Sequence, residues 1–311
     1  MTKRKTKRKT EFSFEEQITQ VFDADEEPTD SQLVQLSNLT EEELDSFGRV
    51  WATVKTERRR QIIARLADLG EDNLRLDFGK VFLACLGDGD EEVRLQAVLG
   101  LEGEEDSSVI SPLIWLFKED PFDKTRVAAA IVLSQFALLA EMGKLPSDQA
   151  EEVYSVLLAV LEDEVESLEV KGRALEAIAF FATPRVKELI EEAYHSDDTE
   201  LKASALLAMG RNCDLAWLPI LVKEMDNAEA EIRYEVAEAC GELGVEETVP
   251  HLLHLAHDED IQVRQAACKS LEKVGEPEAK RALHQLLSSP HDDVRETAKS
   301  AVADMESFDF G

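Results

Sequence analysis

Residues 258–274 read DEDIQVRQAACKSLEKV, and this stretch decides the fold. An acidic turn leads into an apolar residue, a basic residue, two variable positions and a small apolar residue, and a further apolar residue follows four positions later. These residues are Val263, Arg264, Ala267 and Leu271. Apolar side chains at i, i+4 and i+8 lie along one stripe of an α-helix. The stretch therefore predicts an amphipathic helix that buries this stripe against a neighbour.

The same pattern recurs along the chain at a nearly constant step. Its basic residues stand at positions 94, 126, 171, 202, 233, 264 and 295, so the steps are 32, 45, 31, 31, 31 and 31 residues. A second apolar segment precedes each helix, as at residues 216–225 and 248–256. Such a helix pair cannot bury its apolar face alone, so successive pairs must stack. We predict an all-α fold, a right-handed α-solenoid of about eight antiparallel helical hairpins.

The repeat pattern resembles the HEAT repeat family, specifically its phycobilisome-lyase-like subclass, in which an acidic turn precedes Val-Arg, two residues and Ala. Residues 258–274 match that arrangement, and the resemblance extends from about residue 74 to about residue 304. HEAT architecture is shared by the deoxyhypusine hydroxylases, whose di-iron site uses His-Glu dipeptides. None of the six histidines here is followed by Glu, so the resemblance carries no such site over.

The pattern also predicts how the chain is organised. A capping box at Thr40 and Glu43 opens a helix, and Arg58 to Leu69 is its expected partner. The predicted segments are a disordered basic tail (1–12), a short amphipathic helix with an acidic linker (13–31), N-terminal capping helices (32–72), the HEAT-repeat solenoid (73–306) and a disordered C-terminus (307–311).

Charge is strongly unbalanced, with 34 Lys and Arg against 66 Asp and Glu and a net charge of −32. Six of the basic residues lie in the first ten positions, MTKRKTKRKT. An acidic solenoid disfavours nucleic acid and anionic lipid and favours a basic protein partner, although the basic tail could bind nucleic acid. No stretch is apolar enough to span a membrane, and we expect a cytoplasmic monomer.

The basic residues of the repeat also have a structural interpretation. Four of them follow an acid by four positions, which suits a ladder of ion pairs that joins successive repeats. Exposed pairs of this kind contribute about 0 to 1 kcal/mol each. The predicted ladder consists of Asp90 and Arg94, Asp198 and Lys202, Glu229 and Arg233, and Asp260 and Arg264.

Two apolar surfaces are candidates for binding. The second helices of HEAT pairs line the concave side, and this face is apolar in the early repeats at Leu95, Leu99, Val127 and Ile131. We expect the partner to bind there. A capping box at Ser13 and Glu16 predicts that the N-terminal segment forms an amphipathic helix, and we expect this helix to dock on that surface and gate it. Its apolar face consists of Phe14, Ile18, Val21 and Phe22.

The sequence contains none of the common catalytic motifs that we searched for. The chain has no phosphate-binding glycine loop, no GxSxG and no HExxH. His251, His254 and His257 have a spacing that could bind a metal, but the pattern favours a polar outer helix face. The sequence thus predicts a non-catalytic scaffold or adaptor, with no cofactor. Two alternatives stay open: an enzyme or enzyme accessory that binds a metal or tetrapyrrole, and a nucleic-acid-associated factor that uses the tail.

Overall fold

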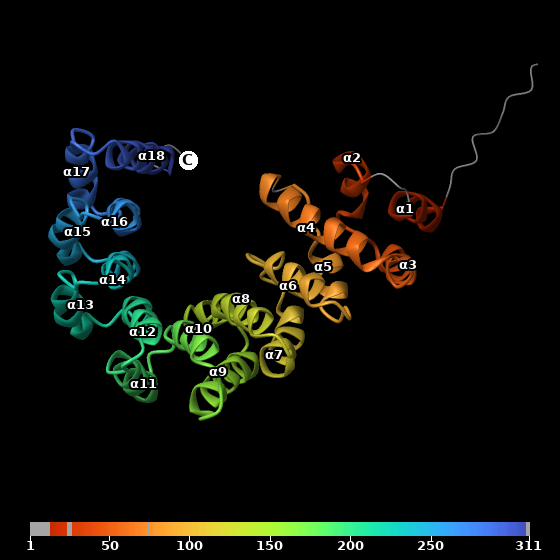
Figure 1. The fold of residues 1–311 in the computed structure, drawn as a ribbon, viewed down its shortest axis with the longest axis horizontal. Helices are drawn as coiled ribbons and strands as arrows, with labels where there is room; N and C mark the ends of the chain where they lie inside the picture. The colour runs from red at the N-terminus through yellow and green to blue at the C-terminus, as the bar shows by residue number, and fades with distance from the viewer. Residues whose placement is uncertain (1–12, 24–26, 74, 309–311) are drawn as a thin grey trace, which may run out of the picture. The chain divides into compact units, whose positions relative to one another are not determined.

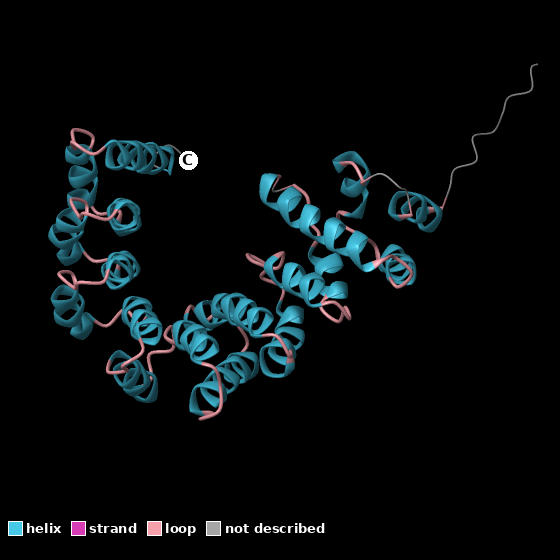
Figure 2. Cartoon of the chain, in the orientation of Figure 1, coloured by secondary structure: helices cyan, strands magenta, loops and turns pink. Residues whose placement is uncertain are grey.

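The computed structural model describes residues 13–23, 27–73 and 75–308. Within these ranges the chain forms 18 α-helices, four short 3-10 helices and no strand (Figure 2). This confirms the predicted all-α solenoid of helical hairpins. The predicted basic tail, residues 1–12, lies outside the described residues. Two compact units divide the chain, Met1–Val132 and Leu133–Gly311, and the expected border between residues 72 and 73 does not coincide with that division.

Unit 1, Met1–Val132, begins with two short helices and continues as hairpins. Helix α1 packs on α3, α2 on α4, and α4 on α6, so the predicted cap and the first repeats share one core. Helices α1 and α3 both start at the predicted capping boxes, at Ser13 and Thr40. The bounds are α1 (Phe14–Phe22), α2 (Asp30–Leu33), α3 (Glu41–Trp51), α4 (Thr56–Asp72), α5 (Gly79–Cys85), α6 (Glu91–Leu99) and α7 (Ile110–Glu119), followed by the start of α8 (Asp123–Glu141).

Unit 2, Leu133–Gly311, is a two-layered stack. Five helices form what we name the first-helix layer: α9 (Ser147–Glu162), α11 (Pro184–Tyr194), α13 (Leu218–Glu224), α15 (Val249–Leu255) and α17 (Pro277–Leu286). The second-helix layer consists of α10 (Leu168–Ile178), α12 (Thr199–Arg211), α14 (Ala230–Leu243), α16 (Ile261–Val274) and α18 (Asp292–Phe308). Consecutive helices of the second layer pack on one another, and in Figure 1 this layer lies on the concave side of unit 2.

Local sequence explains where these helices begin and end. Proline occupies the first or second position of α11, α13, α15 and α17, where a missing amide donor costs little. Gly244 and Gly275 end α14 and α16 with φ of 65° and 68°, a conformation that glycine adopts without strain. The long step predicted between positions 126 and 171 corresponds to the 19-residue helix α8.

Small side chains let the second helices of unit 2 approach one another closely. Ala177, Ala208, Ala239 and Ser270 are fully buried, as their repeated small size predicts. Glycine contributes as well, because a Cβ atom built on Gly210 would lie 2.5 Å from the carbonyl oxygen of Ala239 on the next helix. The inner helices are thereby held in a fixed register, which places the residues after each basic anchor on one continuous face.

Candidate functional site

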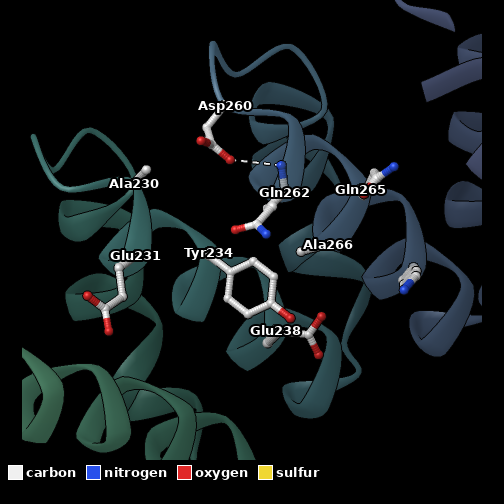
Figure 3. A pocket seen from close by; sticks show the side chains of 9 residues that line it. Ala230, Glu231, Tyr234, Glu238, Asp260, Gln262, Gln265 and Ala266 are labelled. Atoms are coloured by element: carbon white, nitrogen blue, oxygen red, sulfur yellow. Dashed lines mark hydrogen bonds between the residues drawn. The ribbon is translucent and has the colours of Figure 1, made fainter. Parts of the chain in front are cut away.

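A cleft of about 610 Å³ lies between α14 and α16 on the second-helix layer of unit 2 (Figure 3). The sequence pattern predicts that residues one, two and five positions after each basic residue face the concave side. Tyr234 and Glu238 follow Arg233 at two of these positions, and Gln265, Ala266 and Lys269 follow Arg264 at all three. All five line the cleft, together with Ala230, Glu231, Asp260 and Gln262.

Tyr234 occupies the middle of the α14 wall. Glu231, Tyr234 and Glu238 stand at i, i+3 and i+7, which places them on one face of the helix, as Figure 3 shows. Lys273 forms an ion pair with Glu238 at 2.8 Å, whereas Asp260 accepts the amide of Gln262 at 2.8 Å. Burial raises the pKa of Tyr234 above its ordinary value, the charges of Glu238 and Glu235 raise it further, and the charge of Lys273 opposes the rise. The phenol is therefore neutral at physiological pH.

A second cleft, of about 470 Å³, lies between α16 and α18 on the same layer. Lys269 lines both clefts, so they adjoin across α16. The second cleft has a more apolar lining, which includes the buried residues Ala301 and Met305. The second-helix layer therefore presents an acidic aromatic cleft and an apolar cleft side by side.

Another carboxylate of α14, Glu235, lies half-buried on the side that faces the earlier repeats. Burial raises its pKa to about 7, the neighbouring charge of Glu176 adds to the rise, and Arg173 opposes it. Glu176 itself is buried and accepts hydrogen bonds from Arg173 at 2.8 Å and from Ser204 at 2.7 Å. Glu235 of α14 and Glu176 of α10 thus interact with each other and with Arg173, and Ser204 of α12 binds Glu176.

The ion-pair ladder exists, but the predicted partners were wrong. Arg94 pairs with Asp120 at 2.6 Å and Arg233 with Asp258 at 2.7 Å, in each case with an acid in the following turn. The acid four residues before the basic residue has another task, as at Asp90, which accepts the amide of Val93 at the start of α6. The remaining pairs are Lys202 with Glu224 and Arg264 with Asp293. Asp198 and Asp260 cap their helices by accepting backbone amides. Glu229 is the N-cap residue of α14, and its side chain makes no capping hydrogen bond.

The Arg94 and Arg233 pairs are buried and the other two are partly buried, contrary to the prediction of exposed pairs. The side chains of Arg94 and Asp120 are 9% and 0% exposed. Arg94 also donates to the carbonyl oxygen of Asp88, and Arg233 to that of Asn227. Each arginine therefore joins the turn before its own helix to the turn of the next repeat. A sequence signal for these acceptors existed, because Asp120 and Asp258 each precede the next basic residue of the pattern by six positions.

The predicted partner surface lies in unit 1. Leu95 and Leu99 are half-buried on α6, Val127 is half-buried on α8, and Ile131 on α8 is 38% exposed. Apolar atoms are thus accessible at all four positions. The assignment of a partner to this surface stays a prediction.

The expected docking helix, α1, has a different position from the predicted one. Ile18, Val21 and Phe22 are buried, and Phe14 is half-buried. The ring of Phe22 lies 6.2 Å from that of Phe47 on α3. Because this apolar face is already covered by α3, the hypothesis that α1 gates the surface at residues 95–131 was wrong.

The histidines and other metal-binding side chains give no centre in the described part of the chain. His254 Nε2 lies 3.3 Å from Asp226 Oδ1. His251 is half-buried and His254 exposed on α15, and His257 is exposed just after the helix ends. Among residues 13–23, 27–73 and 75–308, no group of three or more His, Cys, Asp and Glu side chains could hold a metal ion. Over the same residues, no helix combines the length and apolarity that crossing a membrane requires.

Comparison with known families agrees with this geometry. A family model described as HEAT repeats matches residues 218–303, which include both walls of the α14–α16 cleft. These residues are HEAT repeats. The resemblance inferred from residues 258–274 is confirmed, and the matched residues include the basic residues at positions 233, 264 and 295 of the 31-residue step.

Solved structures show the same fold over most of the chain. The complex of CpcE and CpcF of phycocyanin lyase from Nostoc sp. PCC7120 is similar over 90% of this chain and 96% of that one, with a TM-score of 0.54 and 15% identity. Yeast importin-beta (Kap95p) is similar over 94% of this chain and 46% of its own length, with a TM-score of 0.53 and 15% identity. At these identities the similarity shows the HEAT solenoid fold.

A curated relative corrects the prediction that the protein is not an enzyme. Deoxyhypusine hydroxylase of Candida albicans is 30% identical over 120 residues, which are 38% of this chain and 35% of the relative. The matched segment thus spans about a third of that enzyme. Exclusion of an enzyme rested on missing motifs alone, and kinship with an enzyme contradicts it.

Proposed function

We propose that the chain is a HEAT-repeat scaffold that binds a protein partner along the second-helix layer of unit 2. The observation that carries the proposal is the cleft of about 610 Å³ between α14 and α16. Its walls consist of the side chains that the repeat sets on the concave face, so neighbouring repeats extend the same surface. The similar phycocyanin lyase structure is a complex of two chains, CpcE and CpcF, which supports protein binding by this fold.

Charge favours a basic partner. The chain carries 66 acidic against 34 basic side chains, and the exposed Glu231 is one of these acids on the layer. Complementary charge speeds association and excludes acidic competitors. The apolar surface at Leu95, Leu99, Val127 and Ile131 is a second proposed contact, in unit 1.

Affinity capture with matched variants tests the scaffold. The intact protein is compared with a Tyr234→Ala, Glu231→Lys variant, a Leu95→Asp, Ile131→Asp variant and the control Glu152→Lys, which makes one of the same charge changes at an exposed position of α9. Circular dichroism first establishes that each variant is folded. A protein retained by the control and lost from the α14 variant supports the proposal. Loss only from the Leu95 variant moves the contact to unit 1, and equal capture by all four overturns both sites.

A catalytic function is the second candidate, and the relationship to deoxyhypusine hydroxylase favours it. The described residues do not fit a di-iron centre, because none of the histidines is followed by Glu and no metal-binding group of three is present among them. We therefore derive no step through iron. The test is to incubate the protein with a deoxyhypusine-containing substrate protein and to look by mass spectrometry for the gain of one oxygen atom, with metal analysis of the same sample.

A further inference from the structure

The cleft between α14 and α16 has the chemistry of a receptor for a cation. The Tyr234 ring projects into it with Glu231 and Glu238 on either side along α14 (Figure 3). Its hydroxyl group forms no hydrogen bond with the other described residues. An aromatic face attracts an ammonium or guanidinium group, and the apolar stem of a lysine or arginine covers the ring as well.

The charges around Tyr234 differ in how far they are already neutralised. Glu238 is paired with Lys273, and Asp260 is engaged in capping α16. Glu231 is exposed and has no ion pair with a described residue, so it is the carboxylate that an incoming cation would meet. Lys269 stands at the opposite end of the cleft, next to the apolar cleft, and repels a second cation there.

We propose that the α14–α16 cleft binds a lysine or arginine side chain of the protein partner, stacked on Tyr234 with Glu231 as its counter-ion. This inference rests on the proposed scaffold function and specifies the chemistry that the surface recognises. The adjoining α16–α18 cleft, with Ala301 and Met305, receives an apolar side chain of the same segment.

The two clefts set the spacing of the two side chains. Packed helices lie about 8 to 10 Å apart. An extended peptide advances about 3.3 to 3.6 Å per residue. A segment that crosses α16 therefore places the cation and the apolar residue about three positions apart.

Fluorescence anisotropy with the full chain tests whether the two clefts bind a cationic and an apolar side chain. The probe is a labelled octapeptide, Gly-Ala-Arg-Ala-Ala-Leu-Ala-Gly, and the two matched peptides carry citrulline in place of Arg or Ala in place of Leu. Citrulline keeps the shape of arginine and removes its charge. We expect the citrulline peptide to bind about tenfold more weakly, since a desolvated cation on an aromatic ring is worth about that factor.

Protein variants assign the effect to the cleft. Tyr234→Ala should weaken binding of the arginine peptide about tenfold and binding of the citrulline peptide by a smaller factor, because citrulline loses only the contact of its stem with the ring, whereas Tyr234→Phe should keep the affinity because the ring is retained. Glu231→Gln should weaken binding about threefold, and Glu152→Gln should have no effect.

Three results would overturn the inference. These are equal affinity for the arginine and citrulline peptides, equal losses in Glu231→Gln and Glu152→Gln, and no binding of the arginine peptide to the intact chain. If affinity capture still yields a partner that depends on Tyr234 and Glu231, the scaffold function stands and only the cation assignment fails. If neither experiment shows dependence on the cleft, both fail.

Discussion

Arg94, Arg233 and Arg264 each bind two groups at once, which depends on the planar, five-donor guanidinium group. Arg233 donates to Asp258 across the repeat boundary and to the carbonyl of Asn227 in its own turn. A lysine could not span both groups with the same geometry. At position 202, where lysine does stand, the acceptor is the longer side chain of Glu224, which is buried and also held by Tyr194.

The Arg94–Asp120 pair gives a stability prediction. Asp120→Ala leaves a buried guanidinium group without its counter-charge, and breaking such a pair by removing one partner costs about 3 to 5 kcal/mol. The double variant Arg94→Met, Asp120→Leu should recover most of that loss because no charge stays buried. Urea denaturation followed by circular dichroism measures both. If Asp120→Ala lowers the free energy of unfolding by less than about 1 kcal/mol, the pair contributes no more than an exposed ion pair does.

Glu235 gives a pH prediction. Its pKa in the folded protein is about 7, above the ordinary value of 4.5, so the folded state holds the proton more tightly than the unfolded state. Stability from this group is present below pH 4.5 and is lost as the pH rises to about 7. Glu235→Gln should therefore raise the melting temperature at pH 8 and have little effect at pH 4.5. The same shift in the exposed control Glu152→Gln would point to a general charge effect instead.

Sequence alone identified the basic residues of the ladder but misassigned their partners. The helical spacing favoured Asp90 as the partner of Arg94, because residues four positions apart share a helix face. The real acceptor, Asp120, is 26 positions away and comes near only after two hairpins have stacked. Tyr234, Glu238, Gln265 and Lys269 were correctly assigned to the concave face, because that assignment needed only the helix period.

Helix boundaries follow from local signals at the scale of the element. The capping boxes at Ser13 and Thr40 were predicted from four residues each, and the structure forms both. The packing partner of α1 could not be predicted in this way. An amphipathic helix is expected to bury its apolar face, but its sequence does not identify the helix that covers that face. Gly210 was also missed, since a glycine within a helix looks only like a weak position until the neighbouring helix is seen.

Two glycine substitutions distinguish close packing from helix propensity. Gly210→Ala places a Cβ atom 2.5 Å from the Ala239 carbonyl oxygen on α14, and such overpacking costs about 1 to 3 kcal/mol. Gly48→Ala on α3 meets no atom within 4 Å and should stabilise by about 0.5 to 1 kcal/mol through helix propensity alone. Thermal denaturation of the two variants should shift in opposite directions. A stabilised Gly210→Ala variant would contradict the close approach of α12 and α14.

The constant 31-residue step, four times repeated, made the solenoid predictable at the scale of the whole molecule. The division at residues 132 and 133 was not predicted. It lies within α8, in the long step of 45 residues, and an irregular step indicates a longer repeat without indicating where contacts become fewer. Relationship to an enzyme was likewise invisible to a search for motifs. It rests on similarity spread over 120 residues and on no short signature.

The net charge of the chain predicts how the stability of the whole molecule depends on salt. With a charge of −32, self-repulsion opposes the compact state, and salt screens it. Raising the ionic strength from about 0.01 M to about 0.15 M shortens the screening length from about 30 Å to about 8 Å. We expect the melting temperature to rise over this range, because the buried ladder pairs are screened less than the exposed acids. A fall would mean that surface ion pairs outweigh the general repulsion.

The arginine link between neighbouring repeats also constrains how the gene can change length. Arg233 and Arg264 each form an ion pair with an acidic residue in the turn of the following repeat. Duplication or loss of one full period of 31 residues leaves Arg233 and Arg264 each followed by a turn that holds an acid. A change out of phase leaves one of these guanidinium groups buried without an anion, so recombination in this region should survive only in whole-repeat steps.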